Sequence, residues 1–152
     1  RRVAVDDFFL GLYETAIQTD EMLVRAEFNK PPPGQRYVFR EIMRRKGDYA
    51  TVGLGIRGQI DQGVCQDLRI VYFAIADKPL VSTRVVELLR HKKLDIAEID
   101  FAVNCLDEDI QAYGDTYHDE HTKMHLMRVL LKRSLLEFIQ LEPAPTKGTE
   151  NV

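Results

Sequence analysis

The feature that most constrains the fold is a strict alternation of apolar residues with polar or small ones between positions 50 and 74. The sequence Asp61-Gln62-Gly63 divides this stretch into two arms. The apolar positions are Ala50, Val52, Leu54, Ile56 and Ile60 in the first arm, and Val64, Leu68, Ile70, Tyr72 and Ala74 in the second. Since successive side chains of a strand point to opposite faces of a sheet, this pattern predicts a β-hairpin with one buried face.

Three glycines, Gly53, Gly55 and Gly58, lie in the first arm of the predicted hairpin. They would let another backbone or a ligand approach this strand closely, or they leave a twisted strand with little to pack on one side. Their spacing also matches the G-x-G-x-x-G pattern of dinucleotide-binding loops. We reject that match because the glycines lie within a predicted strand and do not open a helix.

Two further extended segments are predicted before the hairpin. Residues 36–43 form one of them. In the other, Met22–Phe28, the residues Met22, Val24, Ala26 and Phe28 alternate with more polar positions, which is typical of a half-buried strand. The sequence Pro31-Pro32-Pro33-Gly34 separates the two with a stiff loop, because proline fixes φ and donates no backbone hydrogen bond.

Helices are predicted in the second half of the chain. A short one follows Ser82 or Thr83, a second covers residues 95–110, and a long one runs from about 117 to 141 with Thr116 as its N-cap. The apolar stripe of the long helix comprises Met124, Met127, Leu131, Leu135 and Phe138. Strands followed by helices predict an α+β fold: a small antiparallel sheet of three to four strands with about three helices packed on one face.

Composition excludes several classes of function. The chain has 152 residues, of which 45% are hydrophobic and 30% charged, with a net charge of −3. This balance is typical of a soluble domain and argues against nucleic acid as a partner, because there is no excess of basic residues. No stretch predicts a membrane span or a signal peptide. Cys65 and Cys105 form no Cys-x-x-Cys pair, which favours reduced thiols in a cytoplasmic protein over a metal or iron–sulfur site.

Three histidines have a spacing that deserves a test. His118, His121 and His125 would share one face of the predicted long helix, and imidazoles so placed can bind zinc or nickel. A metal site normally needs ligands from a second element, and none is evident in the sequence. A solvated helix face is therefore the preferred interpretation, and no metal site is predicted.

Four other residues are candidates for binding an anion or a cofactor. Arg44 and Arg45, followed by Lys46, form a cationic cluster that could hold a phosphate, a carboxylate or a cofactor edge, although most such clusters are solvated loop charge. Leu23 is apolar on the polar side of its predicted strand. Arg40 is charged on the same strand face as Val38 and Ile42. Ordinary placement on an edge strand would explain both as well as a ligand would.

Several motifs, taken in order from residue 5 to residue 138, resemble one family. They are Asp7-Phe8-Phe9-Leu10-Gly11 with Thr15-Ala16 and Asp20-Glu21-Met22-Leu23, the run from Phe39 to Val52 that contains Arg44-Arg45, Ala76-Asp77-Lys78-Pro79, Glu87-Leu88-Leu89, Tyr117, and the run from Val129 to Leu135. This ordered set is similar to the FAD-binding subunits of molybdenum hydroxylases, a family that includes carbon monoxide dehydrogenase medium subunits and xanthine dehydrogenase flavoproteins.

The resemblance implies a domain organisation and a cofactor. Residues 1–30 would be the tail end of an FAD-binding domain, 35–141 a C-terminal α+β domain, and 142–152 a disordered tail. FAD would be held mainly by glycine-rich loops that this sequence does not contain. Leu23 matches the family's leucine against the flavin ring, Arg40 its basic residue at the pyrimidine edge, and Arg44 and Arg45 a basic stretch near the flavin.

The resemblance also implies a role in electron transfer. Electrons would come from a molybdopterin subunit through 2Fe-2S clusters of another subunit, pass through FAD, and reach an acceptor. Glu14, where some members have lysine, and Tyr117-His118, where members tend to have Tyr-Arg, depart from the family pattern. A cofactor-free α+β module for protein interaction, descended from the same ancestry, is the alternative.

Overall fold

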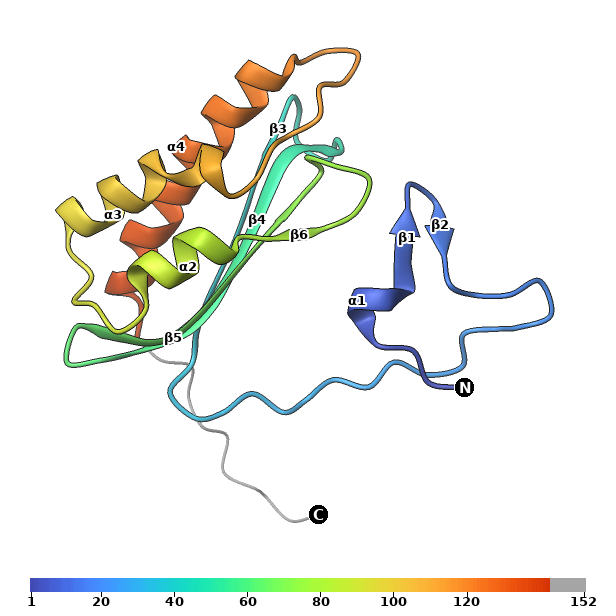
Figure 1. The fold of residues 1–152 in the computed structure, drawn as a ribbon, viewed down its shortest axis with the longest axis horizontal. Coiled ribbons are helices and arrows are strands. Elements are labelled where there is room, and N and C mark those ends of the chain that lie inside the picture. Colours follow the sequence, from blue (N-terminus) through green and yellow to red (C-terminus); the bar gives the residue numbers. More distant parts are fainter. Residues whose placement is uncertain (143–152) are drawn as a thin grey trace. The chain divides into compact units, whose positions relative to one another are not determined.

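The computed structural model describes residues 1–142, which divide into two compact units at Pro31 and Pro32 (Figure 1). Three consecutive prolines at this boundary donate no backbone hydrogen bonds, so no strand can continue through it. Apart from Glu142, the predicted disordered tail of residues 142–152 lies outside the described residues.

The first unit, Arg1–Pro31, contains little regular structure. Its elements are α1 (Val5–Phe8), β1 (Phe9–Gly11) and β2 (Glu14–Thr15), and the two strands pair antiparallel. The predicted strand at Met22–Phe28 was wrong: these residues have no regular structure, and Phe28 is 90% exposed. Alternation suits a strand, but a strand also needs a neighbour for its backbone hydrogen bonds and a layer that covers its apolar face.

The second unit is organised around a four-stranded antiparallel sheet with the order β3-β4-β5-β6. Its strands are β3 (Arg36–Met43), β4 (Ala50–Asp61), β5 (Val64–Phe73) and β6 (Leu80–Val81). The predicted hairpin is confirmed as β4 and β5, in which Leu54 lies opposite Tyr72 and Ile56 opposite Ile70. The turn uses positive φ at Gln62 and Gly63, which explains the glycine at its second position.

The helices that the structure describes between residues 32 and 142 cover one face of the sheet (Figure 1). They are α2 (Thr83–Leu89), α3 (Ile96–Asn104), the 3-10 turn η1 (Leu106–Glu108) and α4 (Glu120–Gln140). The long helix α4 packs on β3 and β4, and its predicted apolar stripe from Met124 to Phe138 is buried. The α+β prediction is thereby confirmed. None of the helices within residues 1–142 has the length and apolarity that a membrane span requires.

The start of α4 differs from the prediction. Asp119, not Thr116, is the N-cap, and its carboxylate accepts a hydrogen bond of 2.7 Å from the amide of Thr122. The amides of Tyr117 and His118 donate instead to Asp115, at 2.8 and 2.9 Å. Because this side chain holds both amides outside a helix, α4 begins three residues later than predicted.

The three glycines of β4 have different surroundings. A Cβ atom on Gly53 would lie 2.0 Å from the ring of Phe73, and one on Gly58 would lie 2.3 Å from the carbonyl oxygen of Asp67. A Cβ atom on Gly55 would meet nothing within 4 Å. Close packing within the unit therefore explains two of these glycines, while Gly55 faces open space on the sheet face opposite the helices.

Candidate functional site

Arg40 lies on β3, at the edge of the sheet. Its side chain is 52% exposed and pairs with the carboxylate of Glu137 on α4. Its second guanidinium nitrogen donates to the carbonyl of Phe39 at 3.0 Å. Ordinary placement on an edge strand was one of the two explanations that the sequence left for this cation, and the structure places Arg40 on the edge strand β3 with Glu137 as its partner. Arg40 is thus an accessible cation with a fixed orientation.

Leu23 belongs to the first unit, whereas Arg40, Arg44 and Arg45 belong to the second. It lies in a segment without regular structure, and its side chain is 59% exposed. Its neighbours Met22 and Val24 are exposed as well. Leu23 is therefore an accessible apolar side chain and is not part of a strand.

Arg44 and Arg45 line a cavity of about 400 Å³ beside the β3–β4 connection. The opposite side of the cavity comes from the segment before α4, which contributes Asp115, Tyr117 and His118. The guanidinium carbon of Arg44 lies 4.3 Å from the centre of the Tyr117 ring, a cation–π contact that fixes this side chain. The structure thus brings two of the predicted residues together with an aromatic ring that sequence reasoning had not placed there.

Asp115 organises the far side of this cavity. It accepts a salt bridge of 2.8 Å from Lys123, whose side chain is buried and also donates to the carbonyl of Ala74 at 3.1 Å. The hydrogen bond from Lys123, followed by the amides of Tyr117 and His118, holds the pKa of Asp115 well below its ordinary value. A sequence signal for Lys123 existed: it lies four residues before Met127, on the apolar side of α4.

The charges of the cavity indicate what it can bind. The positive charge of Lys123 offsets the negative charge of Asp115, and the carboxylate of Asp48 accepts a hydrogen bond of 2.9 Å from the amide of Tyr49. The guanidinium groups of Arg44 and Arg45 leave the cavity with cationic hydrogen-bond donors beside an aromatic surface. Such a lining suits an anionic group, and a phosphate or a carboxylate on a flat ring would satisfy both features.

The three histidines do not share a helix face as predicted. His118 precedes α4 and contacts Asp115 at 3.4 Å, whereas His121 and His125 lie on the helix itself. Within residues 1–142, no group of three or more histidine, cysteine, aspartate or glutamate side chains is arranged to hold a metal ion. The N-cap at Asp119 is the physical reason, because it excludes His118 from the helix.

Comparison with known proteins places the chain in a family. The sequence profile of the CO dehydrogenase flavoprotein C-terminal domain matches residues 37–138. The carbon monoxide dehydrogenase medium chain of Afipia carboxidovorans is 27% identical over 135 residues, covering 89% of this chain and 47% of that protein. The xanthine dehydrogenase FAD-binding subunit of Escherichia coli O157:H7 is 21% identical over 143 residues, covering 91% and 48%.

Solved structures agree with these sequence matches. Quinoline 2-oxidoreductase from Pseudomonas putida 86 superimposes with a TM-score of 0.83 at 28% identity, covering 92% of this chain and 48% of that one. Reconstituted CO dehydrogenase from Oligotropha carboxidovorans gives 0.82 at 26% identity, covering 92% and 49%. The chain spans about half the length of the relatives it matches. With the profile matched from β3 into α4, the chain belongs to the CO dehydrogenase flavoprotein C-terminal domain family.

Proposed function

We propose that this chain is the C-terminal part of the FAD subunit of a molybdenum hydroxylase and closes the flavin site. The family match over residues 37–138 carries this proposal, because it covers the sheet, the helices and the predicted contact residue Arg40. Residues 1–30 would then be the tail end of the FAD-binding domain, and 35–141 the C-terminal domain.

The residues of this chain suit FAD chemically. Leu23 offers an exposed apolar side chain to a flat ring, and Arg40 offers a half-exposed guanidinium held in place by Glu137. FAD, when bound, would accept electrons and pass them on, and negative charge then develops at its pyrimidine edge. A fixed cation such as Arg40 stabilises that charge without reorganising, which is the contribution we assign to this residue.

The partners follow from the same proposal. The N-terminal FAD-binding region would hold most of the cofactor, and sister subunits would supply the 2Fe-2S clusters and the molybdopterin. The free thiols of Cys65 and Cys105 support a reducing compartment, the cytoplasm. The cavity beside Arg44 and Arg45 would lie near the flavin, where its cationic lining would help to receive an anionic electron acceptor.

The test uses the longest reading frame that contains this sequence, co-expressed with its adjacent genes. Flavin absorbance of the purified product is recorded for the wild type, Arg40→Ala and Leu23→Asp. We expect flavin bands in the wild type and a clear loss of bound flavin in both variants. The matched control is Arg84→Ala, which removes an exposed arginine from α2 on the second unit.

A second control separates the cation from its salt bridge. Glu137→Gln removes the charge of the partner but keeps an oxygen that accepts a hydrogen bond from Arg40, so the guanidinium stays in place and flavin should be retained. Loss of flavin in Glu137→Gln as well as in Arg40→Ala would show that the ion pair only holds α4 on β3. A colourless, folded wild type would instead sink the flavin assignment and favour the cofactor-free interaction module.

A further inference from the structure

Two arginines of β3 bind the last turn of α4. Arg36 donates to the backbone carbonyls of Phe138 and Ile139 at 3.3 and 3.0 Å, which belong to the end of the helix where carbonyls lack partners within the helix. Arg40, four residues further along the strand, pairs with the carboxylate of Glu137. Because Arg36 ties the end of the helix to β3, the backbone as well as the side chain keeps Glu137 beside Arg40.

The pair of Arg40 and Glu137 lies at the surface of the second unit. The side chain of Arg40 is 52% exposed and that of Glu137 is 33% exposed. A group that binds at Arg40 therefore meets a guanidinium whose positive charge is partly offset by a carboxylate. The carboxylate repels a negative charge that the guanidinium attracts, so it limits how strongly Arg40 stabilises an anionic group.

We propose that Glu137 is a positioning residue for the flavin, which orients Arg40 and keeps the reduction potential of the flavin low. The inference rests on the proposed function, in which Arg40 lies at the edge of the flavin where reduction builds negative charge. A guanidinium without a partner would stabilise the reduced flavin and raise its potential. With Glu137 beside it, Arg40 still donates hydrogen bonds but stabilises the added charge less, so reduced flavin gives its electrons to the acceptor more readily.

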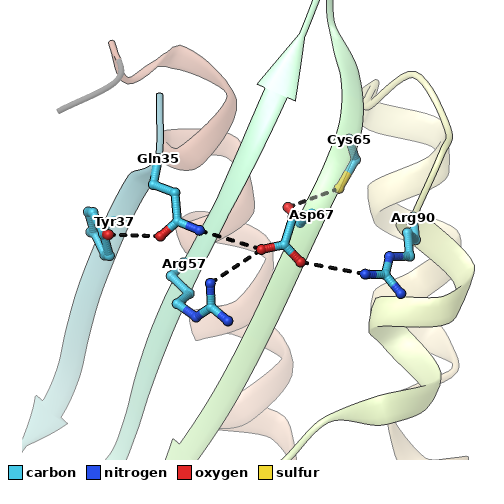
Figure 2. Close-up of polar contacts among 6 residues, drawn as sticks. All are labelled: Gln35, Tyr37, Arg57, Cys65, Asp67 and Arg90. Atoms are coloured by element: carbon cyan, nitrogen blue, oxygen red, sulfur yellow. Dashed lines mark hydrogen bonds and ion pairs between the residues drawn. The ribbon is translucent and has the colours of Figure 1, made fainter. Parts of the chain in front are cut away.

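A second carboxylate of the same unit offers a matched control (Figure 2). Asp67 on β5 accepts from Arg57 at 3.2 Å and from Gln35 at 3.5 Å, and it lies 3.6 Å from Arg90. Its side chain is 35% exposed, close to the 33% of Glu137. Both carboxylates therefore pair with an arginine of the sheet and have similar access to water.

The position of Asp67 in the sheet separates it from Arg40. Arg40 lies opposite Leu54, and Leu54 lies opposite Tyr72. Asp67 precedes Tyr72 by five residues on β5, which corresponds to roughly 16 Å along the strand. This exceeds the Debye length of about 10 Å at 0.1 M salt, so the charge of Asp67 is largely screened from a group at Arg40.

The test is a spectroelectrochemical titration of the flavin in the longest reading frame that contains this sequence, co-expressed with its adjacent genes. Bound flavin is recorded first, and the midpoint potential is then measured for the wild type, Glu137→Gln and Asp67→Asn. We expect Glu137→Gln to shift the equilibrium roughly tenfold toward reduced flavin, a rise of about 30 mV for a two-electron couple. Asp67→Asn removes the same charge and should shift it less than about twofold.

An unchanged or lower potential in Glu137→Gln would contradict the proposal. An equal rise in Asp67→Asn would contradict it as well, because it would reveal only an effect of net charge. If Glu137→Gln does not hold flavin, Glu137→Asp and Glu137→Asn make the same comparison with a shorter side chain, and equal potentials in that pair, or loss of flavin from all three variants, would overturn the proposal. Flavin with an unchanged potential contradicts only the role of Glu137, whereas a colourless wild type contradicts the proposed function on which that role rests.

Discussion

The two units of this chain differ in what holds them together. The second unit buries a continuous apolar core between its sheet and its helices, with Leu54, Ile70, Leu131 and Phe138 fully or almost fully enclosed. The first unit has no such core, and its large apolar side chains, among them Leu12, Tyr13, Met22, Val24 and Phe28, are exposed. The difference shows that apolar content alone does not make a folded layer; the residues must also lie on elements that can face one another.

Polar contacts take the place of a core in the first unit. Arg1 binds both carboxylate oxygens of Glu21, at 2.7 and 2.8 Å, and thereby joins the start of the chain to residue 21. This contact and the amide of Gln18 lower the pKa of Glu21 to about 2. The side chains of Arg1 and Glu21 are 46% and 33% exposed, and ion pairs at the surface contribute little to stability. We therefore expect the two units to respond very differently to the same changes.

The largest contrast comes from removing one phenylalanine from each unit. Phe138→Ala should lower the free energy of unfolding by about 3–5 kcal/mol, because it leaves a cavity between α4 and β4. Phe28→Ala should change it by less than about 0.5 kcal/mol, because that ring is already in water. Urea unfolding followed by circular dichroism measures both. Similar effects of the two substitutions would show that the first unit has a core of its own.

The second contrast concerns a buried thiol. Burial, and then the charge of Asp67, raise the pKa of Cys65 to about 11. The unfolded chain releases this proton near its ordinary pKa of about 8.5, so the folded state holds more protons between about pH 9 and pH 11. Stability should therefore fall as pH rises through this window, by on the order of 2 kcal/mol in total.

Cys65→Ala should remove this alkaline loss, although it weakens packing at neutral pH. The half-buried Cys105 provides the matched control, and Cys105→Ala should keep the wild-type dependence. The dependence of stability on pH is obtained from unfolding free energies of the wild type and both variants at several pH values between 8 and 11.5. A wild type and a Cys65→Ala variant with parallel pH profiles would refute the assignment.

The sequence predicted the second unit better than the first for a physical reason. The alternation of β4 and β5 and the stripe of α4 are repeated patterns whose partners lie within the chain, so the pattern and the packing agree. Met22–Phe28 shows the same alternation without a neighbouring strand. Among the candidate residues, Arg40 stood out because a charge interrupts an apolar face, whereas the cavity of Arg44 depends on Asp115 and Tyr117, about 70 residues away. A pattern within one segment of the sequence cannot predict a contact between residues so far apart along the chain.

A smaller effect is expected at the buried lysine of that cavity. Lys123→Met removes the salt bridge to Asp115 and the hydrogen bond to Ala74, and should lower the free energy of unfolding by about 1–2 kcal/mol at pH 7. The pKa of Asp115 is depressed in the folded state, so its contribution is present above the unfolded pKa of about 4 and is lost as pH falls below that value.

Lys123→Met should accordingly lose less stability on acidification than the wild type does. Lys132→Met, which removes a half-exposed lysine on α4 paired with Asp100 at 2.5 Å, is the matched control. Its effect should stay below about 0.5 kcal/mol. Two outcomes would contradict a stabilising salt bridge between Asp115 and Lys123. One is an equal loss of unfolding free energy in the two lysine variants, and the other is the same loss of stability at low pH in the wild type and Lys123→Met.

The smallest effect on stability is expected from deletion of the whole first unit. The free energy of unfolding of a chain of residues 32–152 should lie within about 0.5 kcal/mol of that of the 152-residue chain, because the core lies wholly in the second unit and the first contributes no buried layer of its own. The same deletion in the longest reading frame should abolish bound flavin, since Leu23 leaves with it. Guanidinium unfolding and the flavin spectrum measure the two consequences separately. A truncated chain that fails to fold would show that residues 1–31 are needed for the stability of the second unit. It would contradict the conclusion that the second unit is stable without the first.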